Sequence, residues 1–309
     1  MQDLLVLASI PAAVLPVLGF LALIWWLDRF DREPVWLLLL AFGWGAGMAV
    51  PAALWAEQAL VDSIPSLFLA PLVEEPIKAL AVLAIAATRH FDNTTDGFVY
   101  GAAVGLGFGM TENAVYFAEE ARSGSLLGWA WLVAVRSLYA SLMHAASSSA
   151  LGAALGFSKF RSPTIALLAV PAGVVAMLAI HGLWNGLLQA GSAGRAHLGL
   201  LDLVLFPLEL GILGALFALS LLDERRILRR ELDPEAAAGV LPPEHVPILS
   251  SLAARLRDDW LPPGVDQEAY IAAATTLAFR KHQARARPDA ARDDDIEACR
   301  RALTELNGG

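Results

Sequence analysis

The sequence predicts an all-α polytopic membrane protein: a bundle of about seven transmembrane helices with a small cytosolic helical C-terminal tail. Two observations predict this fold class. Of the 309 residues, 57% are hydrophobic and only 17% are charged, whereas soluble domains average about 25% charged residues. The apolar residues also gather in long blocks, and a helix needs about 20 such residues to cross the hydrocarbon core of a bilayer.

Seven apolar runs reach that length. The predicted spans are 4–27, 35–56, 66–88, 97–118, 126–157, 164–190 and 198–222. We expect the first run to be a retained, bent helix, because no Lys or Arg precedes it and it contains Pro11 and Pro16. The fifth run exceeds one perpendicular span, so it either tilts or begins with an interfacial stretch around Trp129 and Trp131.

Basic residues in the connecting segments predict the orientation. One alternating set of loops carries Arg29, Arg32, Arg89, Lys159 and Arg161, and the other carries Arg122 and Arg195. Cytoplasmic loops are enriched in Lys and Arg, so the first set should be cytoplasmic. We therefore expect the N-terminus outside and the C-terminal tail in the cytoplasm.

Two domains follow from this pattern, a bundle over 1–222 and a charged cytosolic tail over 223–309. Within the tail, apolar residues recur at helical spacing over 248–260 and 270–278, which predicts short helices there. The net charge of −9 offers no basic surface for nucleic acid. The single cysteine, Cys299, excludes an intramolecular disulfide.

The third span carries three ionisable residues, Glu74, Glu75 and Lys78. Each charge near the centre of a membrane helix costs about 2.5 to 3.5 kcal/mol, while each Leu or Ile returns only about 0.3 to 0.6. These groups should therefore face other helices or a wet cavity. Lys78 lies three and four residues after the two glutamates, so one carboxylate can pair with it while the other stays available.

Further polar residues occur in the next spans. Glu112 follows Gly101, Gly105 and Gly109, whose spacing strips one helix face of side chains and permits close packing. His144 lies in the fifth span, followed by serines that can bond back to their own helix.

In the sixth span, His181 shares a face with Asn185, four residues on. Arg136, in the fifth span, could pair with Asp202 or Glu209 of the seventh, and we expect these three residues to form structural ion pairs or part of a cavity wall.

Glutamates and histidines without a nucleophile favour hydrolysis by activated water, with nearby donors holding the oxyanion. Peptide hydrolysis is the reaction expected. A divalent cation such as zinc could instead be held by Glu75, Glu112, His144 and His181, and the residue types leave the metal-free glutamate mechanism equally open. The same groups could also form a proton-coupled transporter or ion pathway, and the glycine faces a scaffold for partner helices.

Four motifs, read together, resemble one family. They are Glu74-Glu75-Pro-Ile-Lys78, the segment from Asp96 to Phe108-Gly-Met-Thr-Glu112-Asn113, His144, and His181-Gly-Leu-Trp-Asn185. This order resembles the PrsW family of intramembrane proteases, over roughly residues 66–190. The family is related to the CAAX prenyl endopeptidases, whose second motif ends in histidine where this chain has Glu112.

The resemblance implies a polytopic peptidase of the bacterial cytoplasmic membrane, often described as a metalloprotease. It implies single-span membrane proteins such as anti-sigma-factor-like regulators as substrates. Glu74 and Glu75 would supply the general base and its partner, and Lys78 would tune them. Glu112 would help to hold the water or a metal. His144, His181 and Asn185 would complete the site, with the helix of His181 giving the oxyanion contacts.

Overall fold

The computed structural model describes residues 2–28, 30, 32–257, 260–286, 288 and 290–307. Arg29 and the side chain of Asp202, which enter two of the predictions above, lie outside the described residues. The chain forms two compact units: residues 1–27 and 33–217 make the first, and 28–32 and 218–309 make the second. Within the described residues the secondary structure is helical, without strands, which confirms the predicted all-α class.

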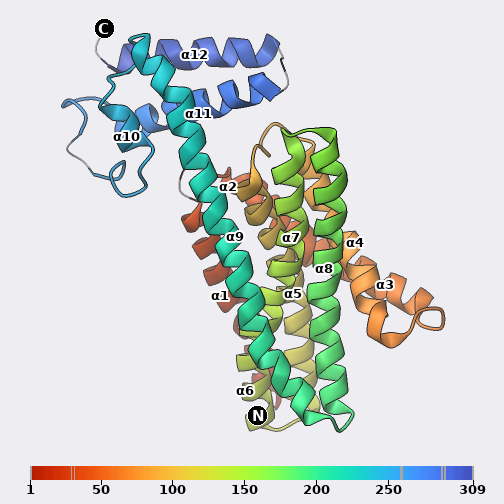
Figure 1. Ribbon diagram of the computed structural model, residues 1–309. Coiled ribbons are helices and arrows are strands. Elements are labelled where there is room, and N and C mark those ends of the chain that lie inside the picture. The colour runs from red at the N-terminus through yellow and green to blue at the C-terminus, as the bar shows by residue number, and fades with distance from the viewer. Residues whose placement is uncertain are drawn as a thin grey trace. The chain divides into compact units, whose positions relative to one another are not determined.

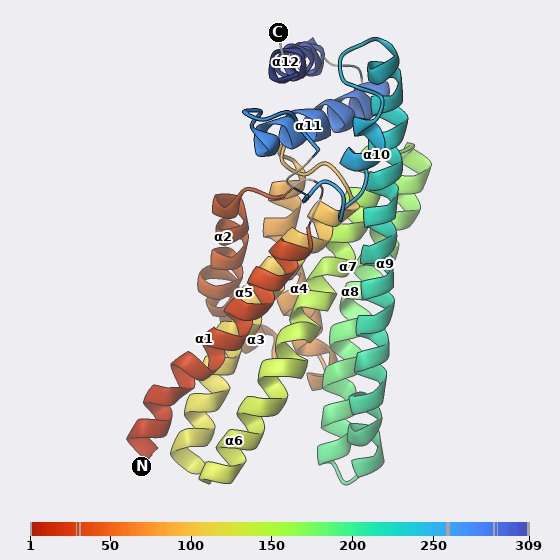
Figure 2. The same ribbon diagram turned by 90° about the vertical axis from the view of Figure 1, so that its left-hand side faces the viewer.

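The first unit is a bundle of long helices (Figures 1 and 2). They are α1 (Gln2–Leu27), α2 (Val35–Gly43), α3 (Val50–Leu60), α4 (Ser66–Ala86), α5 (Thr94–Ser123), α6 (Leu126–Val135), α7 (Ser141–Lys159), α8 (Pro163–Ser192) and α9 (Ala196–Ala237), whose residues up to Phe217 belong here. Short π-helical turns, η1 (Trp44–Ala49) and η2 (Arg136–Ala140), join α2 to α3 and α6 to α7. Each predicted span therefore falls on a helix.

Length and composition qualify five helices of the described chain as membrane spans. These are 2–27, 35–60, 126–159, 163–192 and 203–237. The predicted number of seven is thus not confirmed. The helices α4 and α5 fall short, and α4 does so because it carries Glu74, Glu75 and Lys78 within its apolar sequence. These two helices carry four of the predicted site residues, Glu74, Glu75, Lys78 and Glu112.

Helix α5 forms the centre of the bundle. Every residue from Thr95 to Gly109 is buried, and the predicted glycine face packs against α7. A Cβ atom at Gly105 would overlap the carbonyl oxygen of His144, and one at Gly101 would overlap the backbone of Ser148. The absence of side chains at these glycines therefore sets how closely α7, and with it His144, approaches α5.

The second unit packs the end of α9 with α10 (His245–Leu249), α11 (Gln267–Ala286) and α12 (Ala290–Leu306). Its core contains Leu228, Leu232, Val246, Tyr270, Leu277 and Leu303. The helical pattern over 270–278 lies in α11, as predicted. The helix predicted over 248–260 was wrong, because α10 ends at Leu249 and the described residues that follow form turns. Leu256, within these turns, is 59% exposed.

Candidate active site

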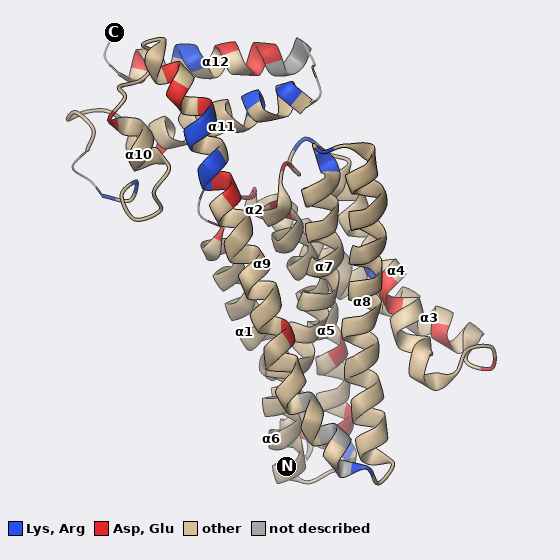
Figure 3. Cartoon of the chain, viewed as in Figure 1, with Lys and Arg blue, Asp and Glu red and all other residues tan. Residues whose placement is uncertain are grey.

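The buried charges of α4 define the site. The bundle carries few charged residues, and those of α4 stand out among its tan surroundings (Figure 3). Glu74 is 6% exposed, and Glu75 and Lys78 are fully buried. Pro76 lies inside the same helix, where it removes one backbone hydrogen bond but does not end the helix. The cost of burying three ionisable groups is offset only if neighbouring helices supply partners.

Glu75 receives those partners from three helices. Its Oε1 lies 2.5 Å from Nζ of Lys78, 2.7 Å from Nδ1 of His181 on α8, and 3.2 Å from Oγ of Ser147 on α7. Ser147 was predicted to bond back to its own helix; its hydroxyl lies 3.0 Å from the carbonyl oxygen of His144, and it also reaches Glu75. These contacts hold Glu75 as a buried, fixed carboxylate.

Lys78 connects this carboxylate to the rest of the site. Its Nζ lies 3.0 Å from Nδ1 of His144 and 3.6 Å from Oε2 of Glu74. The ammonium also stands 4.4 Å from the centre of the Phe108 ring, in a cation–π contact. Since an ammonium group only donates hydrogen bonds, Nδ1 of His144 is the acceptor in this pair.

Glu112 binds His144 from the other side. Its Oε2 lies 2.8 Å from Nε2 of His144 and 2.8 Å from Nη2 of Arg136. Arg136 also donates from Nε to Oδ1 of Asn113 at 2.9 Å and stacks over the ring of Tyr116. Arg136 thus pairs with Glu112 rather than with Glu209 of the seventh span, and its expected alternative place in a cavity wall is confirmed.

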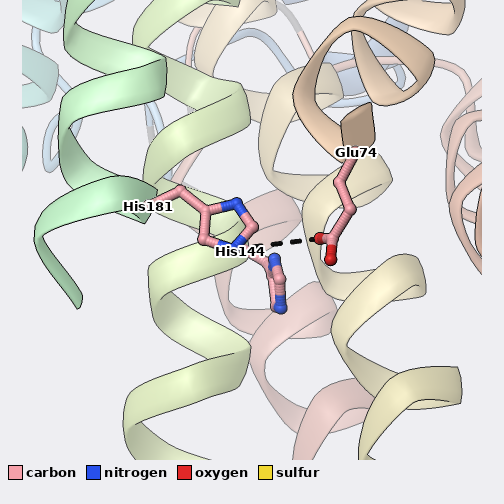
Figure 4. A group of neighbouring side chains, drawn as sticks. All are labelled: Glu74, His144 and His181. Carbon is pink, nitrogen blue, oxygen red and sulfur yellow. Dashed lines mark ion pairs between the residues drawn. The ribbon is translucent and has the colours of Figure 1, made fainter. Parts of the chain in front are cut away.

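Glu74, His144 and His181 point toward one another from three helices (Figure 4). Each offers one ligand atom, and these atoms lie within 4.8 Å of one another. Oε2 of Glu74 is buried without a hydrogen bond and stands 3.9 Å from Nε2 of His181. Two imidazoles and a carboxylate are a ligand set that suits zinc, and Glu75 on Nδ1 of His181 is the kind of carboxylate that orients a ligating histidine. The residue types and their spacing thus fit such an ion, and each imidazole that bound it would give up a hydrogen bond that it now accepts, His144 from Lys78 and His181 from Asn185.

A cavity of about 400 Å³ opens beside these groups. Glu74, Glu112, His144, His181 and Asn185 lie on its wall, whereas Glu75 and Lys78 lie behind it. Nδ2 of Asn185 is 3.1 Å from Nε2 of His181. The cavity can hold water and part of a peptide next to a carboxylate, two imidazoles and an amide donor, the groups that hydrolysis of an acyl bond requires.

Comparison with known proteins agrees with this geometry. A family model described as "PrsW family intramembrane metalloprotease" matches residues 33–215, which include every residue of the site. This chain belongs to the PrsW family. It is a membrane-embedded peptidase by that membership.

Three curated relatives of the PrsW-family chain carry the name "Protease PrsW". The protein of Bacillus subtilis is 27% identical over 190 residues, covering 59% of this chain and 84% of its own length. That of Oceanobacillus iheyensis is 26% identical over 195 residues, covering 60% and 86%. That of Geobacillus kaustophilus is 28% identical over 204 residues, covering 64% and 87%. No solved structure matches the chain.

All seven site residues predicted from the sequence of this PrsW-family chain meet in one network: Glu74, Glu75, Lys78, Glu112, His144, His181 and Asn185. The residues whose possible metal-ligand atoms lie together differ from the expected metal ligands. They include Glu74 in addition to the two histidines, and neither Glu75 nor Glu112 belongs to the group. The oxygens of those two contact Lys78 and Arg136. Sequence reasoning missed Glu57, which lies on the cavity wall and is the one acidic residue between 35 and 60.

Proposed function

We propose that this chain is an endopeptidase that hydrolyses peptide bonds of membrane-anchored proteins, with Glu74 as the base that takes a proton from the attacking water. One observation carries this assignment. Glu74 lines the cavity, while Glu75 is held behind the wall by Lys78, Ser147 and His181. A base must lie within reach of water, and of the two glutamates it is Glu74 that reaches the cavity.

Asn185 supports a role in holding the oxyanion. Its Nδ2 carries two hydrogens, and one of them is directed to Nε2 of His181. The second is available to the carbonyl oxygen of a peptide in the cavity. Glu75 accepts a hydrogen bond from Nδ1 of His181, which fixes the imidazole and in turn the amide. A donor that is already oriented stabilises developing charge without reorganisation.

The remaining groups position the base. Lys78 lies within ion-pair distance of both Glu74 and Glu75, and its ammonium also donates to His144. Glu112 and Arg136 hold the opposite edge of the His144 ring. The proton that Glu74 takes from water can pass to the leaving nitrogen, as bond cleavage requires. If Glu74, His144 and His181 instead held a zinc ion, it would supply Lewis acidity at this position, in place of the metal-free role of Glu74 as the base.

The substrate class and location of the reaction follow from family membership and the loop charges. We infer single-span membrane proteins as substrates, with anti-sigma-factor-like regulators as the class that the family resemblance suggests. The bacterial cytoplasmic membrane, with the N-terminus outside and the tail in the cytoplasm, is the location that the distribution of Lys and Arg supports.

The test compares new protein N-termini, by mass spectrometry, in cells carrying wild type, Glu74→Gln or Glu120→Gln at matched expression. Glu120 is a carboxylate on α5 that does not line the cavity, so Glu120→Gln is the control. We expect fragments of single-span proteins to disappear in Glu74→Gln and to persist in the control. Unchanged fragments in Glu74→Gln would overturn the proposal, and ion flux through reconstituted protein would then be measured.

A further inference from the structure

The wall of the cavity carries two acidic residues that the proposed reaction does not use. Glu57 on α3 and Glu119 on α5 both line it. Oε1 of Glu57 is buried without a hydrogen-bond partner. In the described part of the chain, neither Glu57 nor Glu119 has an ion pair with a basic side chain.

The charges on the cavity wall are unbalanced. Four carboxylates line it, those of Glu57, Glu74, Glu112 and Glu119, against one basic side chain, Arg136. The charge of Arg136 is already matched, since its Nη2 lies 2.8 Å from Glu112. Lys78 stands behind the wall, 2.5 Å from Glu75 and 3.6 Å from Glu74. The wall is therefore negative, and no described basic side chain forms an ion pair with Glu57 or Glu119.

A second observation indicates that the cavity takes a ligand. Glu74 is only 6% exposed, yet it lines the cavity and its Oε2 accepts no hydrogen bond, with Nζ of Lys78 3.6 Å away. A carboxylate removed from water without a donor is costly unless a partner arrives. Leu54, Val115 and Leu188 line the same cavity. Such apolar walls suit the methylene stem of a long basic side chain whose head reaches a carboxylate.

We propose that Glu57 and Glu119 form a subsite for a Lys or Arg side chain that flanks the scissile bond of the substrate. This specificity rests on the proposed peptidase function and narrows its substrates to segments with a basic residue beside an apolar cleavage site. A peptide with Glu at that position would meet two uncompensated carboxylates. Like-charge contacts at an interface discriminate strongly against the wrong partner.

The experiment uses internally quenched peptides of one apolar Leu/Ala sequence that carry a single Lys, Gln or Glu, scanned across the central positions. The purified full chain in detergent is assayed for kcat/KM on each peptide. At the best position we expect the wild type to prefer Lys over Glu by about tenfold or more. The ratio of kcat/KM for the Lys and Glu peptides is taken within each variant, so any effect of a substitution on the chemical step cancels.

The variants test each carboxylate in turn. We expect Glu57→Gln and Glu119→Gln each to lower the Lys-to-Glu ratio by several fold, and Glu57→Lys to invert it. Glu120→Gln keeps the wild-type ratio, because Glu120 does not line the cavity. A wild-type ratio near one, or a ratio that Glu57→Gln and Glu119→Gln both leave unchanged, would overturn the subsite.

A binding measurement separates this subsite from the peptidase function. Fluorescein-labelled Lys and Glu peptides are titrated into the Glu74→Gln chain, where the proposed base is absent, and their Kd values are compared. Tighter binding of the Lys peptide, reversed by adding Glu57→Lys, supports the subsite even if no peptide is cleaved by the wild type. Equal Kd values refute it. Cleavage that persists in Glu74→Gln refutes the proposed function instead.

Discussion

Nδ1 of His181 lies 2.7 Å from Oε1 of Glu75, although the two residues are 106 positions apart in the sequence. This contact joins α8 to α4 and fixes the ring so that Nε2 faces the cavity and Asn185. The same carboxylate oxygen accepts from Lys78. Glu75 is therefore the centre of the polar network, and its neighbour Glu74 is the group that the network leaves open.

The two adjacent glutamates should differ in what their loss does. Glu75→Gln leaves Lys78 buried without its shortest ion pair, and breaking a buried pair costs about 3 to 5 kcal/mol. Glu74→Gln removes a carboxylate that accepts no hydrogen bond on Oε2, so it should cost activity rather than stability. Thermal unfolding in detergent checks this, with a lower Tm expected for Glu75→Gln alone. A Tm lowered equally in both variants contradicts the distinction.

Arg136 should act as a positioning residue through Glu112. Without its guanidinium, Glu112 keeps only His144 as a partner, and both the carboxylate and the ring lose their fixed position. We expect Arg136→Gln to lower kcat by about tenfold or more, and Arg136→Lys to recover part of it by restoring the charge. The readout is kcat and KM on one cleaved peptide. Equal kcat in Arg136→Gln and Arg136→Lys would show that the charge is not what matters.

The fold class and the helices were predictable because crossing a bilayer requires long apolar segments, and such segments are visible in sequence. The end of α10 at Leu249, and the turns that follow it, were not predictable in this way. A helix was predicted over 248–260. Its apolar residues recur at helical spacing, but short segments take their conformation from tertiary packing rather than periodicity. Here α10 ends at Leu249, and the apolar spacing beyond it is coincidental.

The predicted site residues could be found from the sequence, because each lies inside an apolar run where a polar side chain is costly. Helix periodicity and the depth of each residue in its span then predicted that they meet. The partners of these residues were harder to predict. Arg136 pairs with Glu112 and not with the seventh span, and nothing in the sequence reveals the π-helical turn in which it lies. Glu57 could have been found in the same way as the other site residues, because it is the one carboxylate within the apolar run of residues 35–60.

The close contact of α5 with α7 predicts a severe effect of one added methyl group. A Cβ at Gly105 would overlap the carbonyl of His144, and neither backbone can move independently of its helix. We expect Gly105→Ala to lower the free energy of unfolding by about 1 to 3 kcal/mol and to displace His144. Gly211→Ala on α9, where a Cβ would meet nothing within 4 Å, is the matched control. Equal unfolding free energies in the two variants would contradict the packing argument.

The ligand set predicts where zinc would bind. Protein purified from zinc-replete cells should carry about one zinc per chain, as expected for a site with three protein ligands. Either His181→Ala or His144→Ala removes one of the three ligand atoms. We expect both variants to lower the zinc content per chain, measured by elemental mass spectrometry, and His282→Ala in the tail to leave it unchanged. The same zinc content in all four proteins would place the ion elsewhere.

The tail unit should lose stability in mild acid through His245. Burial lowers the pKa of this imidazole, whose Nδ1 lies 2.9 Å from the Tyr270 hydroxyl and whose ring meets Trp260 edge to face. The unfolded tail binds a proton near the ordinary pKa of about 6.5, while the folded tail does not until a lower pH. The free energy of unfolding is therefore fully present above about 6.5 and falls as the pH drops toward the lower pKa of the folded state.

Hydrogen exchange of the full chain in detergent, corrected for intrinsic rates, measures this effect in peptides from α10 and α11. We expect less protection at about pH 5.5 than at about pH 7.5 in the wild type, because acid protonates His245 more readily in the unfolded tail than in the folded tail. His245→Gln keeps a hydrogen-bonding group beside Tyr270 but cannot titrate, so its protection should depend less on pH. Since the other tail histidine, His282, is unchanged in this variant, the same pH dependence in both proteins would assign the effect to another group.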